Sequence, residues 1–453
     1  MSESRPGPES RPRRRARLLN GLPSTPREAP LARRLLTDPW LWITVAMTIV
    51  FAACLVSMYL QLHPDKVYEH ATSPGINNDA FRLAFHYAWP TAAVWSAAFL
   101  LLDRFRPQRI VMWYLAFGWG ACVATWAAMY INTWAGELMS VQGAGDPAAG
   151  LRPAVFAAPF VEEACKATVL FALALLMRYR IVSLLQGISL AGLAAIGFAF
   201  IENIVYYSRA IVYSSMTIQA GDAEESVQRL VVVRGFYTSF GHPLFTTMTA
   251  IGLTIGLRTR SKIVRVVAPI TGYCVAALGH MAFNGSSSLI QSDRQEQIYY
   301  IVGVCVFLPV AGFWVGQVFR EGRRVRARLL DYVRMGWLQP RDPIVYSSVL
   351  RRAWLLVLAV SKGPRTFLAT KRTMRAVSEL AYLRDAVTRG IIDQAGLARE
   401  RLLLDEVRAL RTAALTDPVG QRIVLPRFNL RRPAAGVQGW PAPARAIAQP
   451  QRR

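Results

Sequence analysis

The sequence predicts an all-α protein, a polytopic membrane bundle of about eight transmembrane helices with a small cytoplasmic helical region at its C-terminal end. The 453 residues are 53% hydrophobic with a mean hydropathy of +0.26, which is too apolar for a soluble protein of this length. Apolar runs long enough to cross a bilayer recur along the chain. The formal charge of +25 falls at the termini and between these runs, so membrane topology explains it, and we expect no specific nucleic-acid partner.

Eight apolar runs are expected to cross the membrane. They lie at roughly 40–60, 86–102, 110–132, 153–177, 183–207, 231–257, 266–285 and 298–319. The connections between them alternate between basic and acidic or mixed, and the basic ones are 103–109, 178–182 and 258–265. Because basic connections stay in the cytoplasm, both termini are predicted to be cytoplasmic in a multi-pass protein of the plasma or inner membrane.

Four regions are predicted along the chain. A disordered basic cytoplasmic tail (1–34) is followed by an eight-helix transmembrane domain (35–320), whose motifs cluster at 150–290. A cytoplasmic helical region (321–424) and a disordered Pro/Ala/Arg-rich tail (425–453) complete the chain. Amphipathic helices are expected at about 344–360, 371–389 and 391–414. The apolar run Trp354 to Val360 is too short to span, so it packs in a small bundle or lies on the membrane surface.

All five cysteines lie within apolar runs: Cys54, Cys122, Cys165, Cys274 and Cys305. This placement predicts small buried hydrophobic residues and no disulfide framework. No CxxC pair occurs, which argues against a zinc site made of thiolates. No cleavable signal peptide is evident, because the first apolar run begins only at Trp40.

Glu162, Glu163 and Lys166 lie inside the fourth predicted span, where each charge is costly unless it is paired. On a helix Lys166 is three and four residues from the two carboxylates, so it can neutralise one of them but not both. The sequence therefore predicts one ionised and one protonated carboxyl group, an arrangement suited to general acid–base chemistry. Pro159, just upstream, is expected to kink the helix.

Three further spans carry polar residues at membrane depth. Glu202 and Asn203 follow Phe198 in the fifth span, with Phe198 and Glu202 on one helical face. His242 precedes Pro243 in the sixth span, and that proline is expected to open the helix beside the imidazole. In the seventh span His280 and Asn284 are again four residues apart, as the printed sequence shows.

Counting along the predicted helices places these groups in the outer half of the membrane, where they could converge on a cavity reached from outside the cytoplasm. Two classes of function use such groups inside a membrane. One is hydrolysis by activated water, and the other is a proton or ion relay in a transporter.

Four motifs, each on its own span, resemble the PrsW family of membrane proteases, which is related to the type II CAAX prenyl endopeptidases. They are Glu162-Glu163-x-x-Lys166, Phe198-x-x-x-Glu202-Asn203, Gly241-His242 and His280-x-x-x-Asn284, and the resemblance covers roughly residues 110–320. It implies an intramembrane endopeptidase that acts on a membrane-anchored protein, with an anti-sigma factor as the family's founding substrate. The long C-terminal extension is similar to that of actinobacterial members.

The resemblance implies Glu162, Glu163, Glu202, His242 and His280 as catalytic residues, with Lys166, Asn203 and Asn284 in support. In one mechanism Glu162 or Glu163 takes a proton from water, while Asn284 and a histidine stabilise the oxyanion. In the alternative, Glu202, His242 and His280 hold a zinc ion and Glu162 acts as the base. The sequence leaves both mechanisms open.

Overall fold

The computed structural model describes residues 30–67, 72–139, 151–177, 181, 183–216, 223–259, 261–388 and 394–421. Both predicted disordered tails lie outside these residues, apart from 30–34, as do Arg178 and Arg180 of the second basic connection. Within the described ranges all regular secondary structure is helical except for a two-stranded hairpin, β1 (Lys66–Val67) and β2 (Thr72–Ser73). The all-α prediction is confirmed.

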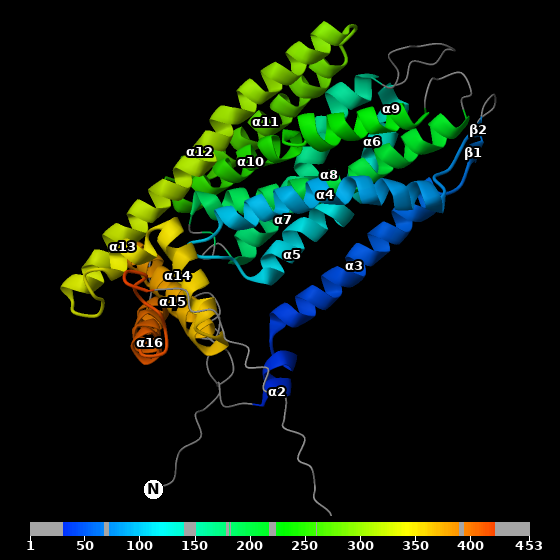
Figure 1. Cartoon of the computed structure of the whole chain (residues 1–453). Helices are drawn as coiled ribbons and strands as arrows, with labels where there is room; N and C mark the ends of the chain where they lie inside the picture. The colour runs from blue at the N-terminus through cyan, green and yellow to red at the C-terminus, as the bar shows by residue number, and fades with distance from the viewer. Residues whose placement is uncertain are drawn as a thin grey trace, which may run out of the picture.

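Figure 1 shows the helices as a bundle with a smaller group at one end. In chain order they are α2 (Leu31–Leu36), α3 (Pro39–Leu62), α4 (Asn78–Leu102), α5 (Ile110–Gly118), α6 (Thr125–Met139), α7 (Ala158–Met177), α8 (Leu184–Met216), α9 (Ala223–Val232), α10 (Gly241–Arg258), α11 (Lys262–Ser287), α12 (Asp293–Arg334), α13 (Asp342–Tyr346), α14 (Val349–Ser361), α15 (Pro364–Thr388) and α16 (Gln394–Leu410). Three π-helical turns join α5 to α6, precede α7 and follow α9; they are η1 (Trp119–Ala124), η2 (Pro153–Ala157) and η3 (Val233–Tyr237).

Five helical segments in the described part of the chain are long and apolar enough to cross a membrane: Pro39–Leu62, Ile110–Met139, Leu184–Ser214, Lys262–Ser287 and Asp293–Arg334. The other three predicted spans correspond to α4, to η2 with α7, and to η3 with α10. The chain is therefore a membrane helix bundle, and the total of eight spans stays a prediction.

Helix α8 lies at the centre of the bundle, and its residues from Ile188 to Ile196 are almost completely buried. Two close helix crossings depend on glycine. A Cβ atom at Gly120 would lie 1.8 Å from the carbonyl oxygen of Ala194 in α8, and one at Gly252 would lie 2.2 Å from that of Ala268. Since these glycines let the backbones approach, α10 and α11 pack closely as an antiparallel pair.

The sixth predicted span, 231–257, is interrupted in the structure. Its helix ends at Tyr237 and begins again at Gly241, so the opening expected beside His242 is a complete break of the helix before Gly241. Pro243 instead occupies the first turn of α10, where its missing N–H has no partner to lose. Helix α4 holds the break, because Thr91 Oγ1 donates to the Gly235 carbonyl and Trp95 Nε1 donates to Ser239 Oγ.

Helix α12 continues without interruption past residue 320, the predicted end of the membrane domain. Near its far end Leu329 and Tyr332 are buried in an apolar core made with α13 to α16. Phe105, from the connection between α4 and α5, is buried in the same core. The two parts of the chain therefore share a packed interface.

Arg352 of α14 forms hydrogen bonds across this interface between the C-terminal helices and the connection from α4 to α5. Its guanidinium donates to the carbonyl oxygen of Arg104 at 3.0 Å and to Ser378 Oγ at 2.7 Å, and the side chain is buried. Burial lowers the pKa of Arg352 to about 10, which reflects the cost of placing a cation there. Those hydrogen bonds offset that cost.

The apolar run in α14 has two faces. Leu355 and Leu358 are fully buried in the core, whereas Leu350, Trp354 and Val357 are exposed. The helix therefore packs in a small bundle with one face, as one of the two sequence alternatives proposed. The exposed face of α14 is apolar, as a helix that lies on the membrane surface requires.

All five cysteines are free thiols. Cys122 is buried and Cys54 and Cys165 are partly buried, but Cys274 and Cys305 are exposed on α11 and α12. The prediction that the cysteines are all buried is wrong for these two, because an apolar helix face at the periphery of a membrane bundle faces outward.

Candidate active site

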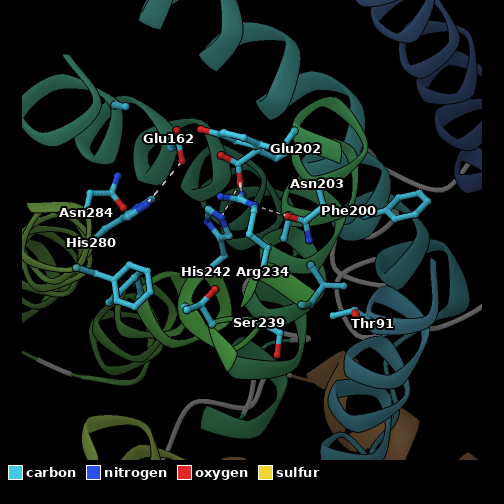
Figure 2. Close-up of a pocket in the computed structure, with 18 of the residues that line it drawn as sticks. Thr91, Glu162, Phe200, Glu202, Asn203, Arg234, Ser239, His242, His280 and Asn284 are labelled. Carbon is cyan, nitrogen blue, oxygen red and sulfur yellow. Dashed lines mark hydrogen bonds and ion pairs between the residues drawn. The ribbon is translucent and has the colours of Figure 1, made fainter. Parts of the chain in front are cut away.

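The predicted site residues from four helices meet around one cavity of about 300 Å³. Figure 2 shows the labelled side chains converging from different helices. Those lining the cavity are Glu162 of α7, Glu202 and Asn203 of α8, His242 of α10, and His280 and Asn284 of α11. Glu163 and Lys166 lie behind this wall, fully buried. The helices therefore bring all eight predicted residues into one cluster.

Glu163 is enclosed by hydrogen-bond donors. Lys166 Nζ lies 2.8 Å from its Oε1, Thr246 Oγ1 donates to its Oε2 at 2.7 Å, and His280 Nδ1 lies 3.2 Å from Oε1. Lys166 also lies 4.1 Å from the centroid of the Phe198 ring. A carboxylate with this many partners is suited to positioning its neighbours.

Glu162 has the opposite character. Adjacent helical residues point about 100° apart, so it faces the cavity while Glu163 faces the protein. Asn132 Nδ2 donates to its Oε1 at 3.4 Å, and Lys166 Nζ lies 3.6 Å from its Oε2. That Oε2 is buried and has no hydrogen-bond partner among the described residues. The pair thus divides into an enclosed carboxylate and a cavity-facing one.

The partners of His280 assign its tautomer. Its Nδ1 faces the carboxylate of Glu163, so Nδ1 carries the proton and donates. Nε2 is then an acceptor, and it lies 4.0 Å from Glu162 Oε2. Two acceptors thus face each other at a distance too long for a direct hydrogen bond, and the gap is suited to a water molecule or a cation. The ring of Phe245 stacks on His280 with centroids 5.1 Å apart.

His242 is held through both ring nitrogens. Lys166 Nζ lies 2.9 Å from Nδ1, and a lysine ammonium can only donate, so Nδ1 accepts. Nε2 therefore carries the proton and donates to Glu202 Oε2 at 2.8 Å. Lys166 thereby links the buried carboxylates of α7 to the imidazole of α10.

Arg234 of η3 is a site residue that the motifs did not indicate. Its Nη2 donates to Glu202 Oε2 at 2.7 Å, and its Nε donates to Asn203 Oδ1 at 2.8 Å (Figure 2). The guanidinium also lies 4.0 Å from the centroid of the Tyr206 ring. Arg234 was detectable as a lone cation within the apolar run 231–240, because an ionisable group at membrane depth marks function by default.

Asn284 lines the cavity, but its Nδ2 donates to the carbonyl oxygen of Ala154 at 3.0 Å. This contact joins α11 to η2. A role for Asn284 in stabilising an oxyanion stays a prediction. Asn132 and Thr246 are two further polar partners of the paired carboxylates, and only the folded structure shows that they lie beside them.

Glu162, His242 and His280 form a group that could hold a metal ion, with one donor atom from each lying within 4.8 Å of the others. Two imidazoles and one carboxylate make a donor set typical of catalytic zinc. The ligand set expected from the sequence has Glu202 in place of Glu162. In the structure Glu202 Oε2 is bonded to Arg234 and His242, so Glu162 is the carboxylate that lies near both histidines.

Residues 106–312 match the family model described as PrsW family intramembrane metalloprotease. The matched range contains the cavity-lining residues of α7, α8, α10 and α11. The resemblance expected from the four motifs over roughly 110–320 is confirmed. Comparisons with the curated proteins and with the solved structures found no match.

Proposed function

We propose, from the PrsW family match of residues 106–312, that this chain is an intramembrane endopeptidase that cleaves membrane-anchored proteins with water activated beside Glu162. The observation that carries the proposal is the pair of unpartnered acceptors, Glu162 Oε2 and His280 Nε2, facing each other across 4.0 Å at the cavity wall. A water molecule between them can give its proton to one and be oriented by the other.

The surrounding residues support defined roles for this pair. Glu162 takes the proton of the attacking water, and the enclosed Glu163 fixes His280 through Nδ1 so that Nε2 faces the reaction. His242, held between Lys166 and Glu202, is the imidazole placed to return a proton to the leaving amine. Helix α10 begins at the cavity wall, so the positive end of its dipole lies where it can stabilise the oxyanion.

The family name implies a metal, and the donor set fits zinc at Glu162, His242 and His280. Glu162 Oε2 and His280 Nε2 have open lone pairs, whereas His242 would have to release Lys166 or Glu202 to become a ligand. When bound, zinc would polarise the scissile carbonyl and make its bound water more acidic. Glu202 would then be the cavity-lining carboxylate left to hold the proton, oriented by Arg234.

The cavity also bears on the substrate. Its lining includes small side chains of α4 and α8, among them Ala88, Ala92 and Ala199. A helix with its side chains is about 10–12 Å wide, so a volume of about 300 Å³ accommodates an unwound segment and not a helix. We propose a single-span protein as substrate, with an anti-sigma factor as the candidate implied by the resemblance. The cut is expected in the outer half of the bilayer.

The test replaces Glu162 by Gln, which keeps the size of the side chain and removes its basicity. We expect loss of cleavage of a co-expressed single-span protein by at least a hundredfold at equal abundance. Glu225→Gln, at an exposed carboxylate of α9, is the matched control and should cleave normally. Wild-type cleavage by the Glu162 variant would refute the role of this residue. Proton-coupled solute flux in liposomes without peptidase activity would support the transporter alternative instead.

A further inference from the structure

A second cavity lies at the end of the bundle towards the C-terminal helices. It has a volume of about 490 Å³ and lies between the end of α10, the start of α8 and the middle of α12. Three arginines line it: Arg258 of α10, and Arg320 and Arg324 of α12. No residue of the active-site cavity lines this second cavity.

The charges in this cavity are unbalanced. Its carboxylate, Glu321, pairs with Arg324 at 3.3 Å and also interacts with Arg258. Arg320 is exposed and forms no ion pair with any described residue. The residues that line the cavity comprise three cations and one carboxylate, and this excess of cations favours a ligand with a negatively charged group.

Gln317 provides an independent indication of a ligand. Its side chain lines the cavity one helical turn before Arg320 and Glu321, and only 8% of the residue is exposed. No hydrogen bond from its amide to any residue in the described ranges occurs. Because Gln317 lines the cavity, its amide can donate a hydrogen bond to an oxygen atom of a ligand there.

The cavity is amphipathic and lies where an apolar surface ends. Ile255 and Leu184 line it beside the arginines, and Ile255 is 44% exposed. On α12 the exposed apolar side chains Val315 and Phe319 come just before Arg320. This order places the cations at the predicted cytoplasmic boundary of the hydrocarbon region, with apolar surface on its membrane side.

We propose that this cavity binds the phosphate headgroup of an anionic phospholipid from the cytoplasmic leaflet. Arg258 and Arg320 neutralise the phosphate, and the amide of Gln317 donates to one of its oxygens. The acyl chains lie against Ile255 and the exposed apolar face of α12. The bound lipid would bridge α10 to the helix that continues into the C-terminal core.

The experiment compares two double variants that lose the same charge. Arg258→Gln with Arg320→Gln removes cations that line the cavity, whereas Arg323→Gln with Arg326→Gln removes exposed cations of α12 outside it. Native mass spectrometry of the full chain in detergent would measure binding of dioleoylphosphatidylglycerol, dioleoylphosphatidylcholine and inorganic phosphate.

We expect phosphatidylglycerol to bind in preference to phosphatidylcholine, with affinity falling about fivefold for each cavity arginine removed, or about 25-fold for both. The control variant should bind nearly as wild type. Equal loss in both double variants, or no preference for the anionic lipid, would overturn the proposal. Occupancy by inorganic phosphate at equal affinity would overturn the lipid as the ligand. If the double variant fails to fold, the single variant Arg320→Gln provides the test, because a change at an exposed side chain should not disturb folding. A normal affinity for phosphatidylglycerol in this variant would then overturn the proposal.

Discussion

Arg234 offers a sharp test of how the active site is held together. It donates one hydrogen bond to Glu202 and one to Asn203 and lies over Tyr206, so it fixes the carboxylate that in turn holds His242. A hydrogen bond to a charged group contributes about 1.5–3 kcal/mol. If one such bond acts through the position of His242, its loss lowers the rate by roughly 10- to 150-fold.

The variant to measure is therefore Arg234→Gln, assayed as kcat and KM on a purified single-span substrate in detergent or bicelles. We expect the loss mainly in kcat, because the guanidinium orients a catalytic group. Arg234→Lys keeps the charge but cannot bond Glu202 and Asn203 with one planar fork, so it should restore only part of the rate.

The matched control is Arg229→Gln in the preceding helix α9. Arg229 is also an arginine in an ion pair, with Glu296, but it is exposed, and surface pairs contribute little. Activity of the Arg234 variant within twofold of wild type would refute the proposed positioning role. An equal loss in the control would assign the effect to the stability of the α9–η3 segment.

Three further outcomes are expected. Thr246→Val removes one donor to Glu163 without changing shape, and should lower kcat about fivefold to tenfold with normal abundance, as measured by cleavage and quantitative blotting. Exhaustive chelation of the purified protein should abolish cleavage and zinc should restore it, with His280→Ala lowering bound zinc in elemental analysis; full activity with no metal detected would exclude a zinc mechanism. Arg352→Ala should lower the thermal unfolding midpoint by several degrees through a loss of about 3 kcal/mol, whereas Arg351→Ala, at its exposed neighbour, should not.

The contacts between site residues on the same helix could be predicted from their spacing in the sequence. Three- and four-residue separations placed Lys166 against both carboxylates, and these contacts depend only on helix geometry. Apolar length and charge alternation predicted a bundle with the motifs on separate helices. Residues close in sequence on one helix were therefore predictable.

Contacts between helices were not predictable in the same way. The sequence could not decide which of Glu162 and Glu163 faces the cavity, because the answer depends on how α7 is rotated against α10 and α11. The break before His242 was read as a proline effect, yet the helix ends earlier and is held by side chains of α4. Arg234 lies in η3, directly before this break, and its partners Glu202 and Asn203 lie on another helix, α8. Contacts between helices are not given by sequence spacing, so these partners could not be predicted.

Helix α12 has a mechanical consequence that follows from its length. Its 42 residues correspond to a rod of about 63 Å. Near one end, Tyr300 and Phe307 stack on Tyr237 and Phe240, which lie at the two sides of the break before His242. Near the other end, Leu329 is buried in the apolar core formed with the C-terminal helices. A stiff rod anchored at both ends behaves as a lever.

A movement of the C-terminal helices is therefore transmitted along α12 to the segment before His242. A tilt of about 3° around Leu329 displaces Phe307, 22 residues and about 33 Å away along α12, by roughly 2 Å. A displacement of that size at Phe240 exceeds the tolerance of the hydrogen bonds that hold the imidazole of α10. A ligand that grips the C-terminal helices could thus switch proteolysis on or off without ever approaching the peptide bond being cut.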